Sequence, residues 1–255
     1  MCGRFGVKLP FSTLAKLLRA EPVDDDLAFG PLDLPSNEWG PDYNIAPTDR
    51  APVVIRSEGL GDRIGLALFR WGLVPFWASD PKVGARMINA RAESVAEKPA
   101  FRESFKSRRL LVPVSGWYEW THPEADPTKK KKDQPRPTPH WISSPRDEVI
   151  LLAGLGATWS DKASGKGLRT FSIITTEAAD STRAVHDRMP VVLEPSQQDL
   201  WLDPTTPPDA LSAMLRPYRG ALEHYPVDLA VNNVRADGPE LIVRIGRVPD
   251  SARGQ

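Results

Sequence analysis

Short apolar runs, each bounded by glycine, proline or charged residues, recur along most of the chain. Their β-branched and aromatic residues are typical of strands, and the residues between them are those of turns. We therefore expect these runs to form strands of one sheet system. The runs are APVVIRS, RIGLALFRWGLVP, RRLLVPV, GWYEW, EVILLAGLGATW, RTFSIITTEA and MPVVLEP.

Helical patterns are fewer and shorter. Leu14, Leu17 and Leu18 recur at helical spacing behind Ser12, a good N-cap residue, and predict a helix in FSTLAKLLRA. The 26 prolines of the chain argue against long helices.

A second helix is predicted in 94–108. Ser94 and Glu97 have the S-x-x-E spacing of a capping box, although Pro99 falls in the first turn. Two further short helices are expected at 195–202 and 207–218, with Ser196 and Asp209 near their starts.

These elements predict an α+β fold with a strand-rich curled sheet or β-barrel-like core and peripheral short helices. We expect a single domain over 1–245 and a flexible C-terminal tail at 246–255. The segment 21–42 is expected to be an acidic loop. The proline- and lysine-rich segment 122–139 interrupts two predicted strands, so a mobile hairpin loop is expected there.

Charge and composition exclude several classes of protein. Lysine plus arginine equals aspartate plus glutamate at 33 each, so the total charge does not demand a polyanionic partner. The chain shows no apolar core of a signal peptide and no run approaching the roughly 20 apolar residues of a membrane span. We expect no membrane partner and no large apolar repeat for assembly, and hence a monomer.

The cysteine and histidine content also limits the chemistry. One cysteine excludes an intramolecular disulfide, which favours a reducing compartment: the cytoplasm in a bacterium, or the nucleus in a eukaryote. Four scattered histidines and one cysteine lack metal-ligand spacing, so we expect no metal and no other cofactor.

The single cysteine, Cys2, lies among Gly3, Arg4 and Gly6 rather than in an apolar run. After removal of Met1, Cys2 would carry both a free α-amine and a thiol, with reference pKa values of about 7.7–8.0 and about 8.5. The amine can form a Schiff base with an aldehyde, and the thiol can then close a five-membered thiazolidine ring. Covalent aldehyde capture and acyl transfer are the two reactions this residue favours; an incidental cysteine is the alternative.

Three other residues could assist such chemistry, and each has a structural alternative. His186 in AVHDRMP precedes a predicted strand and could shuttle protons, or could be a solvated turn residue. Glu119 in GWYEW could be desolvated, with a raised pKa suited to proton exchange, or could face water. Asn89 in MINARAES could orient a reacting group, or could cap the following helix.

Seven motifs, read in order, are MCGRF, YNIAPT, RWGLVPFW, INARAES, GWYEW, ITTEA and VHDRMPVVL. With these motifs the chain resembles the SRAP (SOS response-associated peptidase) family, whose members are abasic-site processing proteins that crosslink to DNA. The resemblance extends from Cys2 to about residue 241. It implies a β-rich α+β fold around one shallow DNA-binding cleft.

The resemblance also implies roles for the four candidate catalytic residues. Cys2 would form a thiazolidine crosslink with the ring-opened aldehyde of an abasic site in single-stranded DNA. Asn89 would hold the Cys2 amine or the sugar. Glu119 would accept a proton from the amine, and His186 would protonate the sugar ring oxygen as the ring opens.

Candidate DNA-binding residues lie in the same motifs. Arg4, Arg91 and Arg188 could neutralise phosphates, with surface ion pairs as the alternative. Pro47 and Trp77 resemble the wedge that separates bases around the site, although Trp77 could also be a core residue. Ala78 follows Trp77 where family members can carry a second aromatic residue.

Three functions are consistent with these residues. The first is an abasic-site crosslinking enzyme of peptidase or lyase type with an N-terminal cysteine nucleophile. The second is a noncatalytic reader of modified or single-stranded DNA, and the third is a cysteine peptidase that uses Cys2 and His186. Single-stranded DNA with abasic sites is the expected partner, and replication-fork proteins are partners that the sequence does not identify.

Overall fold

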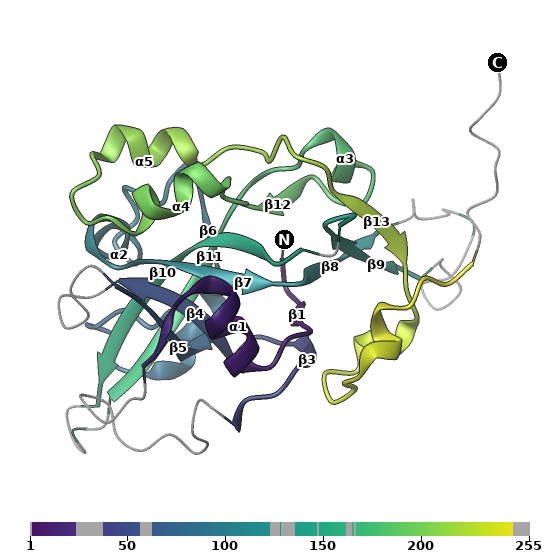
Figure 1. Cartoon of the computed structure of the whole chain (residues 1–255), viewed down its shortest axis with the longest axis horizontal. Coiled ribbons are helices and arrows are strands. Elements are labelled where there is room, and N and C mark those ends of the chain that lie inside the picture. Colours follow the sequence, from purple (N-terminus) through teal and green to yellow (C-terminus); the bar gives the residue numbers. More distant parts are fainter. Residues whose placement is uncertain are drawn as a thin grey trace.

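The computed structural model describes residues 2–23, 38–56, 63–122, 128, 136–146, 148–161, 165 and 167–246. Strands dominate this part of the chain, and short helices lie around them (Figure 1), which confirms the α+β class. The predicted acidic loop, hairpin loop and C-terminal tail lie largely or wholly outside the described residues, and the domain boundary stays a prediction.

The strands are β1 (Phe5–Val7), β2 (Glu21–Pro22), β3 (Asp42–Ile45), β4 (Arg50–Arg56), β5 (Ile64–Trp71), β6 (Asn89–Arg91), β7 (Arg109–Val114), β8 (Gly116–Thr121), β9 (Thr138–Ser143), β10 (Ile150–Ser160), β11 (Gly167–Glu177), β12 (Arg188–Pro190) and β13 (Glu223–Pro226). The helices are α1 (Phe11–Leu18), α2 (Arg102–Ser107), α3 (Asp180–Arg183), α4 (Pro195–Leu202) and α5 (Pro208–Met214), with 3-10 turns η4 (Pro81–Arg86), η6 (Leu229–Asn232) and η7 (Pro239–Ile242).

The larger sheet closes into a barrel. Its strands follow the order β12-β11-β10-β7-β4-β5-β2, and an additional parallel pairing joins β5 to β11. β5, β4, β7, β10 and β11 therefore form a closed ring, and β6 extends it by pairing in parallel with β11. All the long strands of this barrel match runs that the sequence predicts.

The second sheet has the order β13-β9-β8-β1-β3. Of these strands, the apolar pattern predicts only β8. The other four are short and contain glycine, proline or polar residues, and they are held by pairing with neighbours rather than by a long apolar face. β8 and β9 are consecutive in the chain and pair as antiparallel neighbours.

A tryptophan links the two sheets. Trp71, at the end of β5, is fully buried and contacts the ring of Phe5 from β1 edge-on, with 4.9 Å between centroids. It stacks on Phe171 of β11 at 6.4 Å, and its indole nitrogen donates to the carbonyl of Ile88. Large aromatic residues bury much apolar surface, and these contacts fix β1, and with it Cys2, against the barrel.

Two glycines allow the chain to cross itself beside this tryptophan. A Cβ atom at Gly72 would lie 2.6 Å from the carbonyl oxygen of Gly84, and one at Gly84 would lie 2.4 Å from the carbonyl oxygen of Gly72. Gly72 also has φ +118°, a conformation that favours glycine. The crossing packs the segment after β5 against η4, which leads directly into β6 and Asn89.

Several predicted helix starts are wrong. α1 begins after Pro10 without a side-chain cap, so Ser12 is not its N-cap. Ser94 and Glu97 lie in a turn, with the Glu97 amide donating to the Ser94 carbonyl, and the helix forms only after Pro99 as α2. A proline in the first turn disfavours the helical conformation of the residue before it, which explains the later start.

α4 and α5 agree with their predicted segments, whereas α3 is not predicted from the sequence. The N-cap of α4 is Glu194, which forms a capping box with Gln197, and Ser196 lies inside the helix. No helix in the described part of the chain is long and apolar enough to cross a membrane.

Candidate active site

Cys2 lies three residues before the start of β1 and is fully buried. Its carbonyl oxygen accepts a hydrogen bond from Asn89 Nδ2 at 2.7 Å. Asn89 is brought there by the parallel pairing of β6 with β11, in which it lies opposite Ile173. The other side-chain atom of Asn89, Oδ1, is buried and accepts no hydrogen bond from the described residues. Asn89 is therefore bonded to the backbone of Cys2 and has one buried acceptor left without a partner among the described residues.

Burial raises the pKa of the Cys2 thiol, and the nearby charge of Glu119 raises it further. The backbone amide of Arg4 acts in the opposite direction through a hydrogen bond. The thiol is therefore neutral in this environment. A thiol with its reference pKa would be partly ionised near neutral pH, and burial removes that fraction here.

Glu119 projects from β8 beside the start of β1. Phe5 pairs with Trp117, and the amide of Tyr118 donates to the carbonyl of Arg4, so the next residue of β8, Glu119, lies alongside the N-terminal segment. Glu119 shares a strand face with buried Trp117 and is itself only 2% exposed. The alternative of a water-facing glutamate is therefore wrong.

The carboxyl group of Glu119 is poised to exchange protons near neutral pH. Burial raises its pKa from 4.5 to about 7, and Asp187 acts in the same direction, while the positive charge of the chain's amino terminus opposes the shift. A carboxyl group with this pKa can accept a proton from an amine and return it. The structure thus confirms the desolvation predicted from the aromatic surroundings.

His186 follows α3, and its amide donates to the carbonyl of Thr182 at 3.2 Å. Its Nδ1 lies 2.9 Å from the backbone nitrogen of Arg188 and 2.7 Å from Asp187 Oδ1. Only a neutral ring can accept from the Arg188 amide, whereas only a ring with a proton on Nδ1 can donate to Asp187. Burial lowers the pKa of His186, which favours the neutral ring, and the Arg188 N–H that donates to Nδ1 then leaves the ring proton on Nε2.

The site residues share one electrostatic environment. The charge of Glu119 raises the pKa of Cys2, and the charge of Asp187 raises the pKa of Glu119. The chain's amino terminus and His122 both lower the pKa of His186, after burial. The four predicted catalytic residues are thus brought together from the segment before β1, from β6 and β8, and from the turn after α3. His122 was missed in the sequence, because its only signal there is its place two residues after GWYEW.

The three predicted arginines differ in their surroundings. Arg4 is buried, and its Nη1 donates to Asn44 Oδ1 at 2.7 Å and to the carbonyl of Val231 at 2.8 Å. This arrangement supports a packing role, because the second sheet is tied to η6 through it. Arg91, at the exposed end of β6, lies at the surface. Its role in phosphate binding stays a prediction.

Arg188 is largely buried and forms a forked ion pair with Glu93. Its Nη1 and Nη2 lie 2.6 Å and 3.1 Å from the two carboxylate oxygens, and Nη2 also donates to the carbonyl of Thr175. This matches the ion-pair alternative that the sequence leaves open. The pair fixes the start of β12, two residues after His186, against the turn after β6.

The aromatic wedge residues lie at the surface. Trp77 is 56% exposed and Phe76, directly before it, is 63% exposed, so Trp77 is not a core residue. The loop is anchored by Trp159, whose indole nitrogen donates to the carbonyl of Ala78 at 2.7 Å. Pro47 is half-buried in the turn between β3 and β4, where the next residue, Thr48, donates to the carbonyl of Trp71.

Phe76 and Trp77 are adjacent and supply two exposed rings. Ala78 follows Trp77 at the position where family members can carry a second aromatic residue. Phe76 was not identified as a surface residue from the sequence, because an apolar run does not indicate which of its side chains are exposed.

The described residues contain no group of three or more histidine, cysteine, aspartate or glutamate side chains arranged to hold a metal ion. His140 and His224 approach each other across β9 and β13, with 3.4 Å between their Nδ1 atoms, but they form a pair without a third ligand.

The fold is a strand-rich α+β fold, with a five-stranded barrel and an adjoining sheet. Its candidate site is a buried cysteine near the start of the chain, with an asparagine, a glutamate and a histidine around it. The family model described as SOS response associated peptidase (SRAP) matches residues 1–234. The chain belongs to this family.

Several abasic site processing proteins are similar to this chain over most of its length. The abasic site processing protein YoqW of Bacillus subtilis is 36% identical over 95% of this chain and 99% of its own length. The abasic site processing protein YedK of Escherichia coli is 28% identical over 95% of this chain and 99% of its own. HMCES of Xenopus tropicalis, also called an abasic site processing protein, is 29% identical over 82% of this chain and 68% of its own.

A solved structure of a protein from Bacteroides thetaiotaomicron has the same fold. The two structures superpose with a TM-score of 0.78 at 24% identity, over 96% of this chain and all of the other.

Proposed function

We propose that this protein processes abasic sites in single-stranded DNA by forming a covalent crosslink through Cys2 once Met1 has been removed. The observation that carries the proposal is the placement of Cys2 beside a buried carboxyl group, Glu119, whose pKa is about 7. Relatives named abasic site processing proteins support the same lesion as substrate.

The reaction begins at the amine. The Cys2 α-amine attacks the ring-opened aldehyde of the abasic sugar, and the resulting carbinolamine loses water to give an imine. The thiol then adds to the imine carbon, and its proton passes to the nitrogen. One aldehyde and one aminothiol thus give one thiazolidine and one water molecule, and no oxidant or metal ion enters the balance.

A neutral thiol suits this order of steps. Burial and Glu119 disfavour a thiolate at rest, so Cys2 is protected from oxidation and from reaction with other electrophiles. The thiol meets its target only after the imine has formed at the same residue. Ring closure then has the advantage of an intramolecular reaction, which does not require a high thiolate concentration.

Three side chains carry the proton transfers and the alignment. Glu119 accepts the proton that the amine loses on attack and returns it when water leaves. His186, with its proton on Nε2, donates toward the sugar ring oxygen as the ring opens. Asn89 holds the Cys2 carbonyl through Nδ2, and its open Oδ1 accepts from the amine or from a sugar hydroxyl.

Recognition of the strand is assigned to exposed groups. Phe76 and Trp77 offer faces on which bases stack, at about 1–3 kcal/mol for each base regardless of its identity. Pro47, half-buried in the turn between β3 and β4, is assigned to the same wedge, and the exposed Arg91 to phosphates. Lesions arise at any sequence, so contacts that tolerate every base suit this function.

The test is intact-mass analysis of the purified protein, alone and after mixing with a single-stranded oligonucleotide that carries one abasic site. Loss of Met1 and an adduct that survives denaturation without borohydride are expected. The matched oligonucleotide without the lesion should give no adduct.

Two results would favour the alternatives. Salt-sensitive binding with no adduct on any strand would indicate a noncatalytic reader. Turnover of peptides by protein with a blocked α-amine would indicate a cysteine peptidase. The raised thiol pKa disfavours the peptidase, because that reaction needs a thiolate next to His186.

A further inference from the structure

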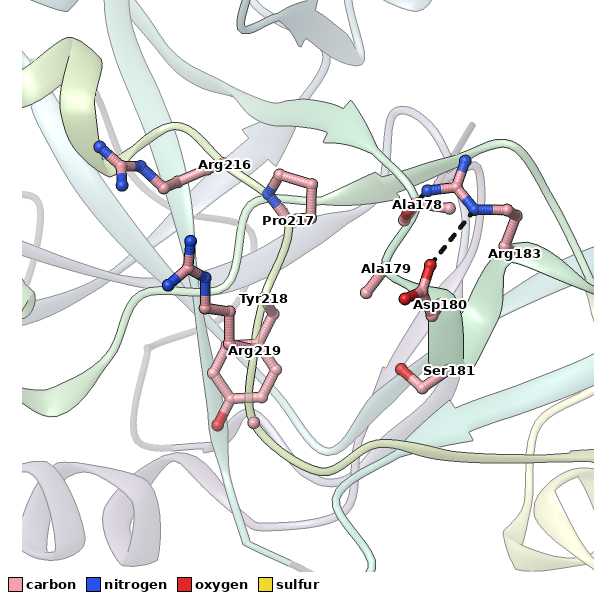
Figure 2. Close-up of a pocket in the computed structure, with 10 residues that line it drawn as sticks. Ala178, Ala179, Asp180, Ser181, Arg183, Arg216, Pro217, Tyr218 and Arg219 are labelled. Atoms are coloured by element: carbon pink, nitrogen blue, oxygen red, sulfur yellow. Dashed lines mark hydrogen bonds and ion pairs between the residues drawn. The ribbon is translucent and has the colours of Figure 1, made fainter.

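A basic groove lies on α3, the short helix that precedes His186 (Figure 2). One wall consists of residues in 178–183 and the other of 216–220, the segment between α5 and β13. The cavity between them has a volume of about 520 Å³. None of the predicted site residues lines it, so the groove is separate from the Cys2 site.

The charges of the groove are predominantly positive. Arg183 lies on one wall, and Arg216 and Arg219 lie together on the other (Figure 2). Asp180 is the one acidic residue among those described as lining the groove, and it pairs with Arg183 at 3.6 Å. Within the described part of the chain, Arg216 and Arg219 form no ion pair, and both are exposed. The groove therefore has two cationic groups that form no ion pair with the described residues, although Glu194 lines an adjoining pocket with them.

The same turn of chain serves the groove and the active site. The Arg183 amide donates to the carbonyl of Ala179, and the His186 amide donates to the carbonyl of Thr182. Arg183 also donates from Nη2 to the carbonyl of Ala178 at 2.8 Å, which fixes its stem in the groove wall. A ligand in the groove would thus lie one helical turn along the chain from the histidine proposed to act on the sugar.

We infer that this groove binds the phosphodiester backbone of the DNA strand that flanks the abasic site. The inference rests on the proposed function and assigns part of the path of its substrate. The required chemistry is a chain of singly charged anions, since the guanidinium groups of Arg216 and Arg219 on one wall can each contact a phosphate, while Arg183 on the other wall is paired with Asp180. The groove would not read base identity, because Tyr218 is the only aromatic residue among the described residues of its walls and is partly buried.

The test measures binding of intact single-stranded DNA by fluorescence anisotropy across a range of salt concentrations. The double variant Arg216→Gln/Arg219→Gln removes the two unpaired charges without placing a carboxylate in the groove. The control is Arg63→Gln/Arg102→Gln, which removes two exposed arginines that line neither the groove nor the proposed site. Exposure of all four side chains makes misfolding a minor concern, and thermal denaturation checks it.

Each phosphate contact on a single strand contributes about 0.7 to the slope of log affinity against log salt concentration. On a long strand, the salt slope of the Arg216→Gln/Arg219→Gln variant should therefore be smaller than that of the wild type by about 1.4. On a strand that covers only the Cys2 site, the slopes of the two proteins should differ by less. An unchanged slope, or a reduction matched by the control variant, would overturn the inference.

Intact DNA keeps this test separate from the crosslinking chemistry. If the wild type gives no adduct on abasic DNA, the proposed function fails, whatever the groove variant does. If the wild type gives the adduct but the groove variant keeps the full salt slope on long strands, only the groove assignment fails.

Discussion

The Cys2 site and the surfaces proposed to hold DNA differ in their exposure to water. Cys2 is fully buried and Glu119 is 2% exposed, whereas Phe76 and Trp77 are more than half exposed. Desolvation sets the pKa values of the first group, and accessibility gives the second group its ability to stack on bases or bind phosphates. Reaction chemistry and recognition are therefore separable, and substitutions in one region should leave a distinct signature from those in the other.

The largest effect is expected at Cys2. Cys2→Ser keeps the α-amine but replaces the thiol with a hydroxyl, so the imine can form and the thiazolidine cannot. The adduct that survives denaturation should fall by at least about 100-fold, because the durable product needs the sulfur. Intact-mass analysis with and without borohydride checks this. Wild-type yield from the variant without borohydride would contradict the mechanism.

The next largest effect is on the pH dependence of stability through Glu119. Its pKa is about 7 in the folded protein against 4.5 ordinarily, so the unfolded chain releases this proton at lower pH than the folded one. Stability therefore falls as pH rises from 4.5 to 7, by about 3 kcal/mol at about 1.36 kcal/mol for each pKa unit.

Glu119→Gln should remove this loss. Relative to the wild type, the variant should gain about 3 kcal/mol in unfolding free energy between pH 4.5 and pH 8. Denaturant unfolding of both proteins at the two pH values measures the difference. If the difference in unfolding free energy between variant and wild type does not change with pH, the carboxyl group of Glu119 ionises as it does in water.

A smaller effect is expected at the exposed wedge. Phe76→Ala and Trp77→Ala should each weaken binding of single-stranded DNA by about 1–3 kcal/mol, the cost of losing one stacked base. Fluorescence anisotropy on intact strands measures the affinity. Leu200→Ala is a matched control, since Leu200 is exposed at 49% and lies on α4. Equal losses in all three variants would argue against stacking.

The smallest effect is expected at Asn89. Asn89→Ala removes the hydrogen bond to the Cys2 carbonyl, and such a bond contributes about 0.5–1.5 kcal/mol. The initial rate of adduct formation should fall about two- to tenfold, while the salt dependence of DNA binding stays as in the wild type. An unchanged rate would show that Cys2 is oriented by its packing alone.

The barrel and the second sheet show which parts of the fold a sequence pattern can predict. The barrel strands have long apolar runs, because both their inner face and parts of their outer face are covered. β1 has only three residues, and β3, β9 and β13 contain polar residues, so none of the four gives a long apolar run; they are held by pairing with neighbouring strands. The capping-box spacing at Ser94 predicts a helix start that Pro99 prevents, since local rules compete within one turn.

The candidate site divides in the same way. Cys2, Asn89, Glu119 and His186 could be named from residue types and motifs, and the structure brings them together. Phe76 could not be named, because Trp77 and Phe76 sit in the same apolar run as buried residues. Nor could the sequence decide whether Arg188 is open to phosphate or held by Glu93, which lies 95 residues away along the chain.

The sequence by itself determined the α+β class, the family and the aminothiol chemistry open to Cys2, because apolar periodicity, ordered motifs and functional groups are properties of the chain. Only the tertiary structure decided that β5 meets β11 to close the barrel and that Glu119 is desolvated. Only the structure set Arg216 and Arg219 opposite Arg183. Each of these depends on segments far apart in sequence, and on water being excluded from one region and admitted to another.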